Sequence, residues 1–75
     1  MPTTTRDIDR IAAIVRVRRA ERGWGQGELA NRASLSARMI RVVEGAERPA
    51  RAATYGRIAL ALEIPLAELL GEEPS

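Results

Sequence analysis

The sequence predicts a small all-α protein, a compact single domain of five short helices. Its 75 residues are too few to divide into two cores that each bury enough apolar surface. Alanine occurs thirteen times, and no stretch alternates apolar and polar residues with the period of two that an exposed strand shows. Helix-breaking residues stand at 23–27, 34–36, 45–49, 65 and 71–74. We expect the core to span about residues 7–70, between short flexible termini.

The first two predicted helices cover residues 7–22 and 26–33. Gly23 ends the first, because glycine readily adopts the left-handed conformation that closes a helix. Gly25 precedes the second and has no side chain to cap it. The apolar residues that share one face of each helix are Ile8, Ile11 and Val15, then Leu29, Ala30 and Ala33.

The third predicted helix is capped by Ser36 and reaches Glu44, and the last two cover residues 52–63 and 66–70. Pro65 suits the start of the last helix, because a missing amide proton costs no hydrogen bond there. The inward-facing residues of the third and fourth helices are Ile40 and Val43, then Tyr55, Ile58, Ala59 and Leu62.

Charge divides the chain into a basic part and an acidic end. All twelve cations are arginine and lie between Arg6 and Arg57, where six acids oppose them and leave a net charge of +6. From Ile58 onward four acids and no cation give −4. A basic block of this density indicates a polyanionic partner such as nucleic acid. Charge alone leaves open the alternative that the arginines occupy ordinary solvated helix faces.

The missing residue types exclude several classes of function. The chain has no cysteine and no histidine, which removes zinc fingers, iron–sulfur clusters and Ser-His-Asp chemistry. We therefore expect no enzyme activity, no metal site and no cofactor. The longest apolar runs, Ile11–Val15 and Ile58–Leu62, are far shorter than the roughly 20 residues of a membrane span. We expect a cytoplasmic protein with no membrane partner.

The second and third predicted helices, joined by a short turn, have the spacing of a helix-turn-helix motif. Such a motif needs a small residue where its helices cross, and Ala30 supplies it. It needs a buried aliphatic residue in the turn, which is Leu35, and two that anchor the second helix, which are Ile40 and Val43. The opposite face of that helix is then free to enter the major groove of DNA.

At these residues the chain resembles the lambda-repressor-like family of bacterial and phage DNA-binding domains, also called the Cro/repressor or XRE family. The resemblance covers about residues 11–70. The segments that carry it are RAERGWGQGELA at 19–30, LSARMIRVVE at 35–44, TYGRIALAL at 54–62 and PLAELL at 65–70. It implies a transcription regulator that binds double-stranded DNA, a homodimeric repressor or autoregulator that reads a palindromic operator in the major groove.

The resemblance also implies which residues meet DNA. They are Gln26, Ser36, Ala37, Arg38, Arg41, Val42, Arg48 and Arg51. Arg38 is expected to read bases, because its planar fork can bond guanine O6 and N7 together. Ala37 and Val42 can contact only thymine methyl groups, and the other arginines suit phosphates. The alternatives are that the arginines are solvated surface cations and that Ser36 is only a helix cap.

Two structural expectations come from the same resemblance. Arg19 and Glu44 occupy positions of a salt bridge that ties the first helix to the third. The expected homodimer interface is the last helix, which has more aliphatic surface than its own docking needs. Its residues are Ile64, Leu66, Leu69 and Leu70. Ile14 and Val17 form a second apolar edge on the first helix, which is either ordinary surface or a partner contact.

The chain departs from the family pattern in two turns. Ser34 stands where glycine is usual, so a left-handed conformation there is mildly strained. Gly45 and Pro49 each lie one residue closer to Glu44 than is usual, although Thr54 keeps its register. We therefore expect the loop after the third helix to be shifted by one residue.

A function of another class remains as the alternative. The chain can be an antitoxin or a restriction-modification controller whose role includes binding a partner protein. The surface that would hold such a partner is the edge of Ile14 and Val17 or the acidic C-terminal end.

Overall fold

The computed structural model describes residues 5–71, with side chains from Asp7 onward. Over this range the chain is all helical and has no strand. Its helices are α1 (Thr5–Glu21), α2 (Gln26–Ala33), α3 (Ala37–Glu44), α4 (Ala52–Leu62) and α5 (Leu66–Leu70). The radius of gyration of 11.3 Å is that expected of a compact chain of this length. Glu72 and Glu73 of the acidic end lie outside the described residues.

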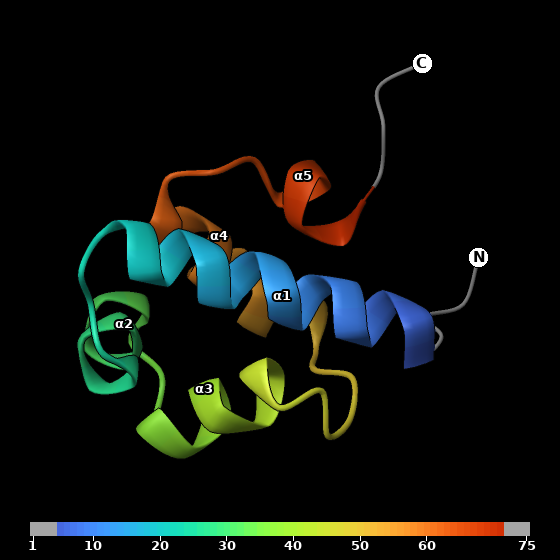
Figure 1. The fold of residues 1–75 in the computed structure, drawn as a ribbon, viewed down its shortest axis with the longest axis horizontal. Coiled ribbons are helices and arrows are strands. Elements are labelled where there is room, and N and C mark those ends of the chain that lie inside the picture. Colours follow the sequence, from blue (N-terminus) through green and yellow to red (C-terminus); the bar gives the residue numbers. More distant parts are fainter. Residues whose placement is uncertain (1–4, 72–75) are drawn as a thin grey trace.

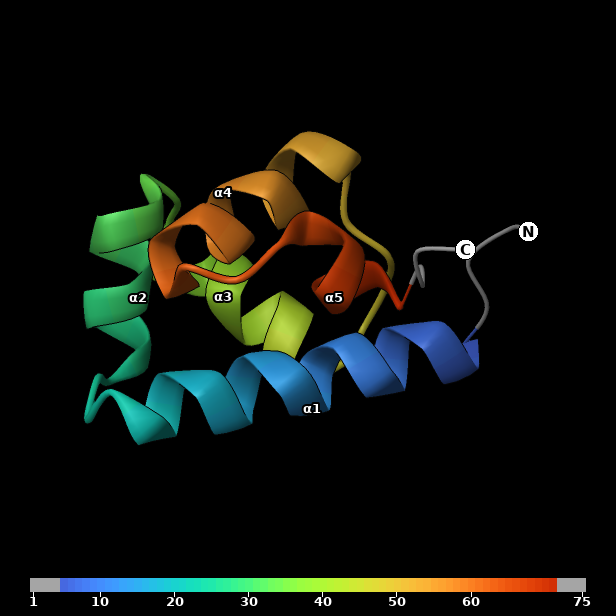
Figure 2. The same cartoon turned by 90° about the horizontal axis from the view of Figure 1, so that it is seen from above.

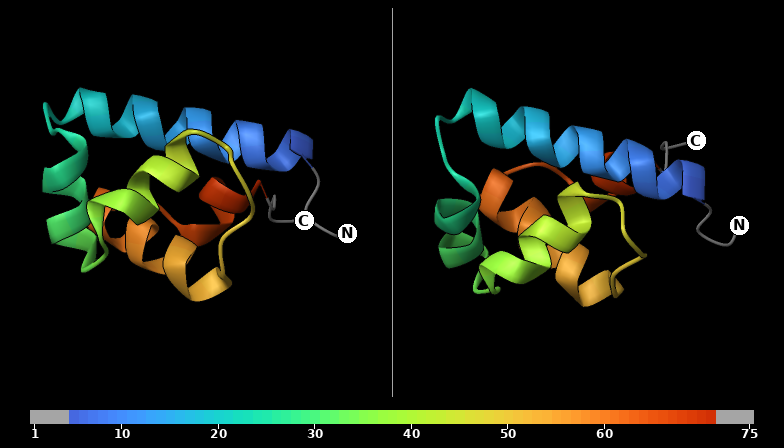
Figure 3. Two further views of the ribbon diagram at one scale, coloured as in Figure 1. Left: turned by 90° about the horizontal axis from the view of Figure 1, so that it is seen from below. Right: turned by 60° about the horizontal axis from the view of Figure 1, so that its bottom comes forward.

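Helix α1 is the long element against which most of the others are arranged. It packs against α3, α4 and α5, while α2 packs against α3 and α4. In Figure 1, α5 lies above α1 and α3 lies below it. Figure 2 shows α2 running across one end of α1. Seen from below, α3 and the loop that follows it lie at the front of the molecule, as Figure 3 shows.

The core receives at least one fully buried side chain from every helix. The largest are Val15, Leu29, Ile40, Ile58, Leu62 and Leu69. Every inward-facing residue expected from helical spacing is buried, so this part of the prediction is confirmed. Core formation by all five helices explains how so short a chain closes without a disulfide.

Two arginines, Arg16 of α1 and Arg22 directly after it, hold the ends of other helices. Arg16 donates a hydrogen bond to the carbonyl of Glu44, the last residue of α3. Arg22 does the same for the carbonyl of Leu62, the last residue of α4. The last carbonyls of a helix have no partner within it and carry partial negative charge, so a guanidinium satisfies both needs. These two cations are therefore part of the fold.

The helix ends follow the sequence in most details. Gly25 makes no side-chain cap for α2, whereas the Ser36 hydroxyl accepts from the Met39 amide at 3.1 Å and caps α3. Ser34 adopts the left-handed conformation, with φ of 56°. A serine there is mildly strained, as the sequence led us to expect.

The loop after α3 corrects one expectation. Gly45 has φ of −87° and is not left-handed, while Ala46 has φ of 51°. The left-handed residue is thus the second after Glu44. Glycine is the first residue after Glu44, so it does not occupy the left-handed position of this turn. Ala46 carries the strain that results, because its Cβ crowds the backbone in this conformation.

In the part of the chain that the structure describes, no helix has both the length and the apolar character needed to cross a membrane.

Candidate nucleic-acid interface

The candidate site is built on the short turn between α2 and α3. The Leu35 amide donates to the Ala30 carbonyl at 2.9 Å, and the Leu35 side chain packs against the core. Ala30 is buried where the two helices meet. Arg57 of α4 donates to the Ser34 carbonyl at 3.3 Å and fixes the outer side of the turn. The turn therefore holds α3 in one direction relative to α2.

Helix α3 turns one face inward and leaves the other uncovered. Ile40 and Val43 are buried in the core. Ser36, Arg38 and Arg41 are exposed. The guanidinium groups of the two arginines have no hydrogen bond or ion pair with any described residue. They are available to a partner outside the chain.

Two of the expected contact residues on α3 are less accessible. Ala37 is half-buried and packs against the core. Val42 is only 6% exposed, which corrects the expectation that it meets thymine methyl groups. The backbone turns after α3, where the Glu47 amide donates to the Val42 carbonyl at 3.2 Å. Helical spacing did not predict the burial of Val42, because Val42 lies away from the face that Ile40 and Val43 define.

The loop between α3 and α4 continues the basic surface of α3. Arg48 and Arg51 are exposed, and neither side chain bonds a described residue. Arg51 is also the residue that precedes α4. Between residues 36 and 51 the one exposed acid is Glu47, and four exposed arginines oppose it. This stretch therefore has an excess of uncompensated positive charge.

The other arginines of the described chain fall into a different group. Those that bond a carbonyl or a carboxylate of the protein are Arg16, Arg18, Arg19, Arg22, Arg32 and Arg57. Apart from the residues on α3 and its loop, only Arg10 lacks such a partner among the side chains described. The arginines thus form two groups. Those of one group bond to other parts of the protein, and most of those without such a bond lie on α3 and the loop after it.

The expected ion pair between Arg19 and Glu44 is present. Arg19 Nε donates to Glu44 Oε2 at 2.6 Å and Arg19 Nη2 donates to Oε1 at 2.9 Å. Arg19 Nη1 also donates to the Trp24 carbonyl at 2.8 Å. Hydrogen bonding to Glu44 raises the pKa of the Arg19 guanidinium; burial opposes this rise and the charge of Glu44 adds to it. The pair joins α1 and the α1–α2 loop to the end of α3.

Gln26 has a partner that sequence reasoning did not find. Its Nε2 donates to Glu44 Oε1 at 3.0 Å, and its side chain is half-buried. Gln26 is the first residue of α2 and Glu44 the last of α3, so the bond joins opposite ends of the two helices. Eighteen residues separate them in sequence, and no local pattern indicates the contact.

The expected dimer interface is smaller than the sequence suggested. Leu69 is fully buried in the core, which corrects its assignment to an intermolecular surface. Ile64 and Leu70 are half-buried and pack against the same core. Leu66 alone of the four is exposed, at 38%. The aliphatic residues of α5 are therefore mostly used in docking this short helix.

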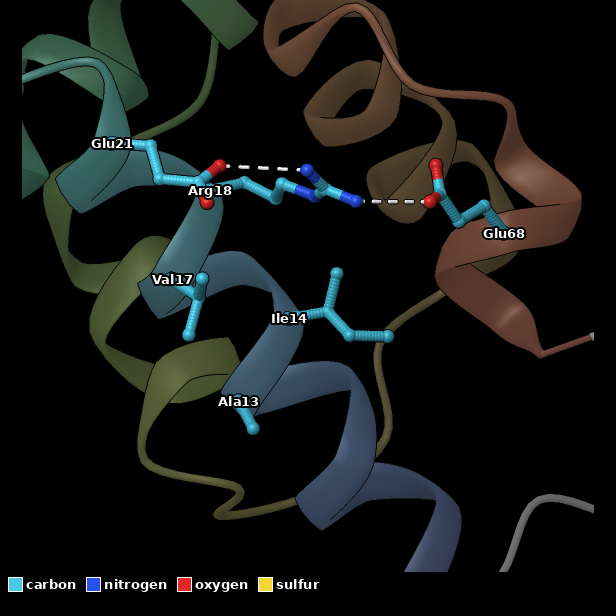
Figure 4. Close-up of a pocket in the computed structure, with 6 residues that line it drawn as sticks. All are labelled: Ala13, Ile14, Val17, Arg18, Glu21 and Glu68. Atoms are coloured by element: carbon cyan, nitrogen blue, oxygen red, sulfur yellow. Dashed lines mark hydrogen bonds and ion pairs between the residues drawn. The ribbon is translucent and has the colours of Figure 1, made fainter.

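An open groove lies between α1 and α5, as Figure 4 shows. Its volume is about 340 Å³, and its floor is apolar, with Ala13, Ile14 and Val17 of α1. Arg18 lies across one side and donates to Glu68 at 3.0 Å and to Glu21 at 3.4 Å. Val17 is 55% exposed. The apolar edge expected from Ile14 and Val17 is therefore part of a real concavity.

Comparison with family models, with curated proteins and with solved structures finds no match for this chain.

Proposed function

We propose that this protein is a sequence-specific regulator that binds double-stranded DNA, with α2 and α3 as a lambda-repressor-like helix-turn-helix. One observation carries the proposal. The arginines that bond nothing within the described chain are Arg10, Arg38, Arg41, Arg48 and Arg51, and four of these five belong to α3 and its following loop. A duplex supplies the phosphates and guanine edges that such a surface lacks within its own chain.

The exposed residues take different roles in this proposal. Arg38 lies on the uncovered face of α3 and reads a base in the major groove. Arg41, Arg48 and Arg51 bind phosphates, which set affinity and orientation. Ser36 caps α3 and stands beside the duplex. Val42 has no part in readout, because it is buried.

We propose further that the protein acts as a homodimeric repressor or autoregulator in the cytoplasm. A dimer places one α3 in each of two half-sites about one helical turn apart, so its operator is palindromic. Leu66, the exposed aliphatic residue of α5, marks the surface through which the copies meet.

Selection of bound duplexes from a random pool tests this function. The expected result is a palindromic consensus whose half-sites are separated by about one turn of DNA. A selected pool no different from the input would contradict sequence-specific binding. A consensus without two-fold symmetry would support sequence-specific DNA binding but would contradict the proposed homodimer.

The groove between α1 and α5 favours a second candidate function, the binding of a partner protein, as in an antitoxin or a restriction-modification controller. The test is co-purification of the tagged chain from its own host, with Val17→Glu compared with Leu60→Glu. Leu60 is also exposed, at 80%, but it does not line the groove. A partner lost only with Val17→Glu supports this function. A partner retained by both variants, or no partner at all, contradicts it.

A further inference from the structure

Glu44 lies at the centre of the only hydrogen-bond network that joins α1, α2 and α3 among the described residues. Glu44 Oε1 accepts from Gln26 Nε2 at 3.0 Å and from Arg19 Nη2 at 2.9 Å. Glu44 Oε2 accepts from Arg19 Nε at 2.6 Å. The side chain of Glu44 is 3% exposed. A carboxylate this buried and doubly paired has one orientation available to it.

From this geometry we infer that Glu44 is a positioning residue for DNA binding, which orients the amide of Gln26 toward a phosphate of the duplex. The inference rests on the proposed function. It adds Glu44 to the residues that matter for DNA binding, although Glu44 is buried and would act only through Gln26.

The chemistry of the glutamine amide supports this role. The amide has two N–H donors and one carbonyl acceptor, and only a donor can face a carboxylate favourably. Glu44 therefore determines which end of the Gln26 amide points inward. One N–H is used by Glu44, and the other remains free for an anionic oxygen.

Gln26 is only half-buried, so part of its side chain is accessible to solvent. It begins α2, and neither of its neighbours, Gly25 and Gly27, has a side chain that could cover it. A partner in solvent can therefore reach this residue. A side chain already held in its bound rotamer loses less conformational entropy when it meets a ligand.

A double-mutant cycle tests the inference, with affinity for a labelled duplex of mixed sequence as the readout. Gln26→Met removes the donor and keeps the length of the side chain, and we expect about a tenfold loss of affinity. Glu44→Gln should weaken binding about fivefold in the wild-type background, since the amide is then less ordered. In the Gln26→Met background it should have no further effect. Equal losses in both backgrounds would show that Glu44 acts through the fold alone and would overturn the inference.

Arg16→Ala is the matched control for damage at the end of α3. It removes the bond to the Glu44 carbonyl and does not touch the bonds of the Glu44 carboxylate to Arg19 and Gln26. At a temperature where it is folded, this variant should bind the duplex as the wild type does. A loss equal to that of Glu44→Gln would also overturn the inference.

A measurement without DNA keeps the test decisive if Glu44→Gln does not fold. In an NMR spectrum of the wild-type protein, the two side-chain amide protons of Gln26 should be widely separated, because one of them bonds a carboxylate. Signals at the positions of a free glutamine would overturn the inference. Failure of the wild type to bind any duplex would remove the proposed function itself, whereas binding without coupling in the cycle would remove only the role of Glu44.

Discussion

Arg19 of α1 holds Glu44 at the end of α3 through two parallel hydrogen bonds, at 2.6 and 2.9 Å. The carboxylate is almost fully buried, and the guanidinium has a side-chain exposure of 19%. Removal of one member leaves the other charge without a partner in a poorly solvated place, which is far more costly than the loss of a surface pair.

Arg19→Ala should therefore lower the free energy of unfolding by about 3 kcal/mol, enough to unfold much of a domain of this size. Arg18→Ala is the control, because Arg18 pairs with Glu21 and Glu68 at the surface and should cost at most about 1 kcal/mol. Urea unfolding followed by the fluorescence of Trp24 measures both. Equal costs for the two variants would contradict the structural role of Arg19.

The pH dependence of this pair has a definite sign. The pKa of Arg19 is raised in the folded protein, so its contribution is complete below the ordinary arginine pKa and is lost only as pH rises through the higher folded value. Arginine stays charged throughout the physiological range. Titration of Arg19 should thus cause no change in stability between about pH 6 and pH 10, and thermal unfolding at several pH values measures this. A loss of stability over that range that disappears in Arg19→Lys would contradict it.

Substitution of Arg38 and of Arg51 by alanine should change DNA binding in different ways. Arg38→Ala should cost about 1–3 kcal/mol on the selected operator and relax the preference at one base pair. Arg51→Ala should weaken all duplexes alike and reduce the slope of affinity against salt by about one unit. Fluorescence anisotropy at several salt concentrations measures both effects.

Arg10→Ala is the matched control for these two variants, because Arg10 also lacks an internal partner but lies on α1. It should leave the affinity nearly unchanged. An equal effect of all three substitutions would mean that DNA responds to net charge alone, and the assignment of a DNA-binding surface to α3 would be wrong.

Ala46→Gly should stabilise the protein by about 0.5–1 kcal/mol, since glycine removes the strain of a left-handed alanine and loses part of that gain to its greater freedom when unfolded. Gly45→Ala should be destabilising, because the new Cβ lies 3.0 Å from the Arg41 carbonyl oxygen. Thermal unfolding of both variants measures the effects. If Gly45 were the left-handed residue of this turn, Ala46→Gly would lower the stability, which would contradict the described backbone.

Substitutions at Leu69 and Leu66 test two different properties, the stability of the fold and the self-association of the protein. Leu69→Ala removes a fully buried side chain and should cost about 2–5 kcal/mol of stability. Leu66→Glu should leave the fold intact, because Leu66 is exposed, and should prevent the proposed dimer from forming. Sedimentation and thermal unfolding measure the two outcomes. A dimer that survives Leu66→Glu would place the contact elsewhere.

Sequence alone predicted the helices and their inward faces, because both depend on local spacing and on breakers such as Gly23 and Pro65. Helix ends moved by one or two residues: α1 begins at Thr5 and α4 ends at Leu62. These boundaries depend on tertiary contacts such as the bond from Arg22 to the Leu62 carbonyl, which joins residues 40 apart. Local spacing contains no information on such contacts.

The candidate site was predicted less completely than the fold. Exposure of Arg38 follows from its place on α3 opposite both Ile40 and Val43, and the structure agrees; Arg41 is exposed as well. Burial of Val42 was not predicted, because Val42 lies away from the face of α3 that Ile40 and Val43 define. The sequence also could not separate arginines that bond the protein from those that bond nothing within it. That division depends on side chains brought together from distant parts of the chain.

The bonds from α1 to the end of α3 have a consequence for protein engineering. Arg16 bonds the last carbonyl of α3 and Arg19 bonds the carboxylate of the same residue. A designer who grafted residues 26–44 onto another scaffold would transfer the turn and the exposed face of α3 but would leave both of these cations behind. Glu44 would then lie in the new host as an uncompensated charge. The smallest transferable unit of this protein therefore begins within α1, ten residues before the motif itself.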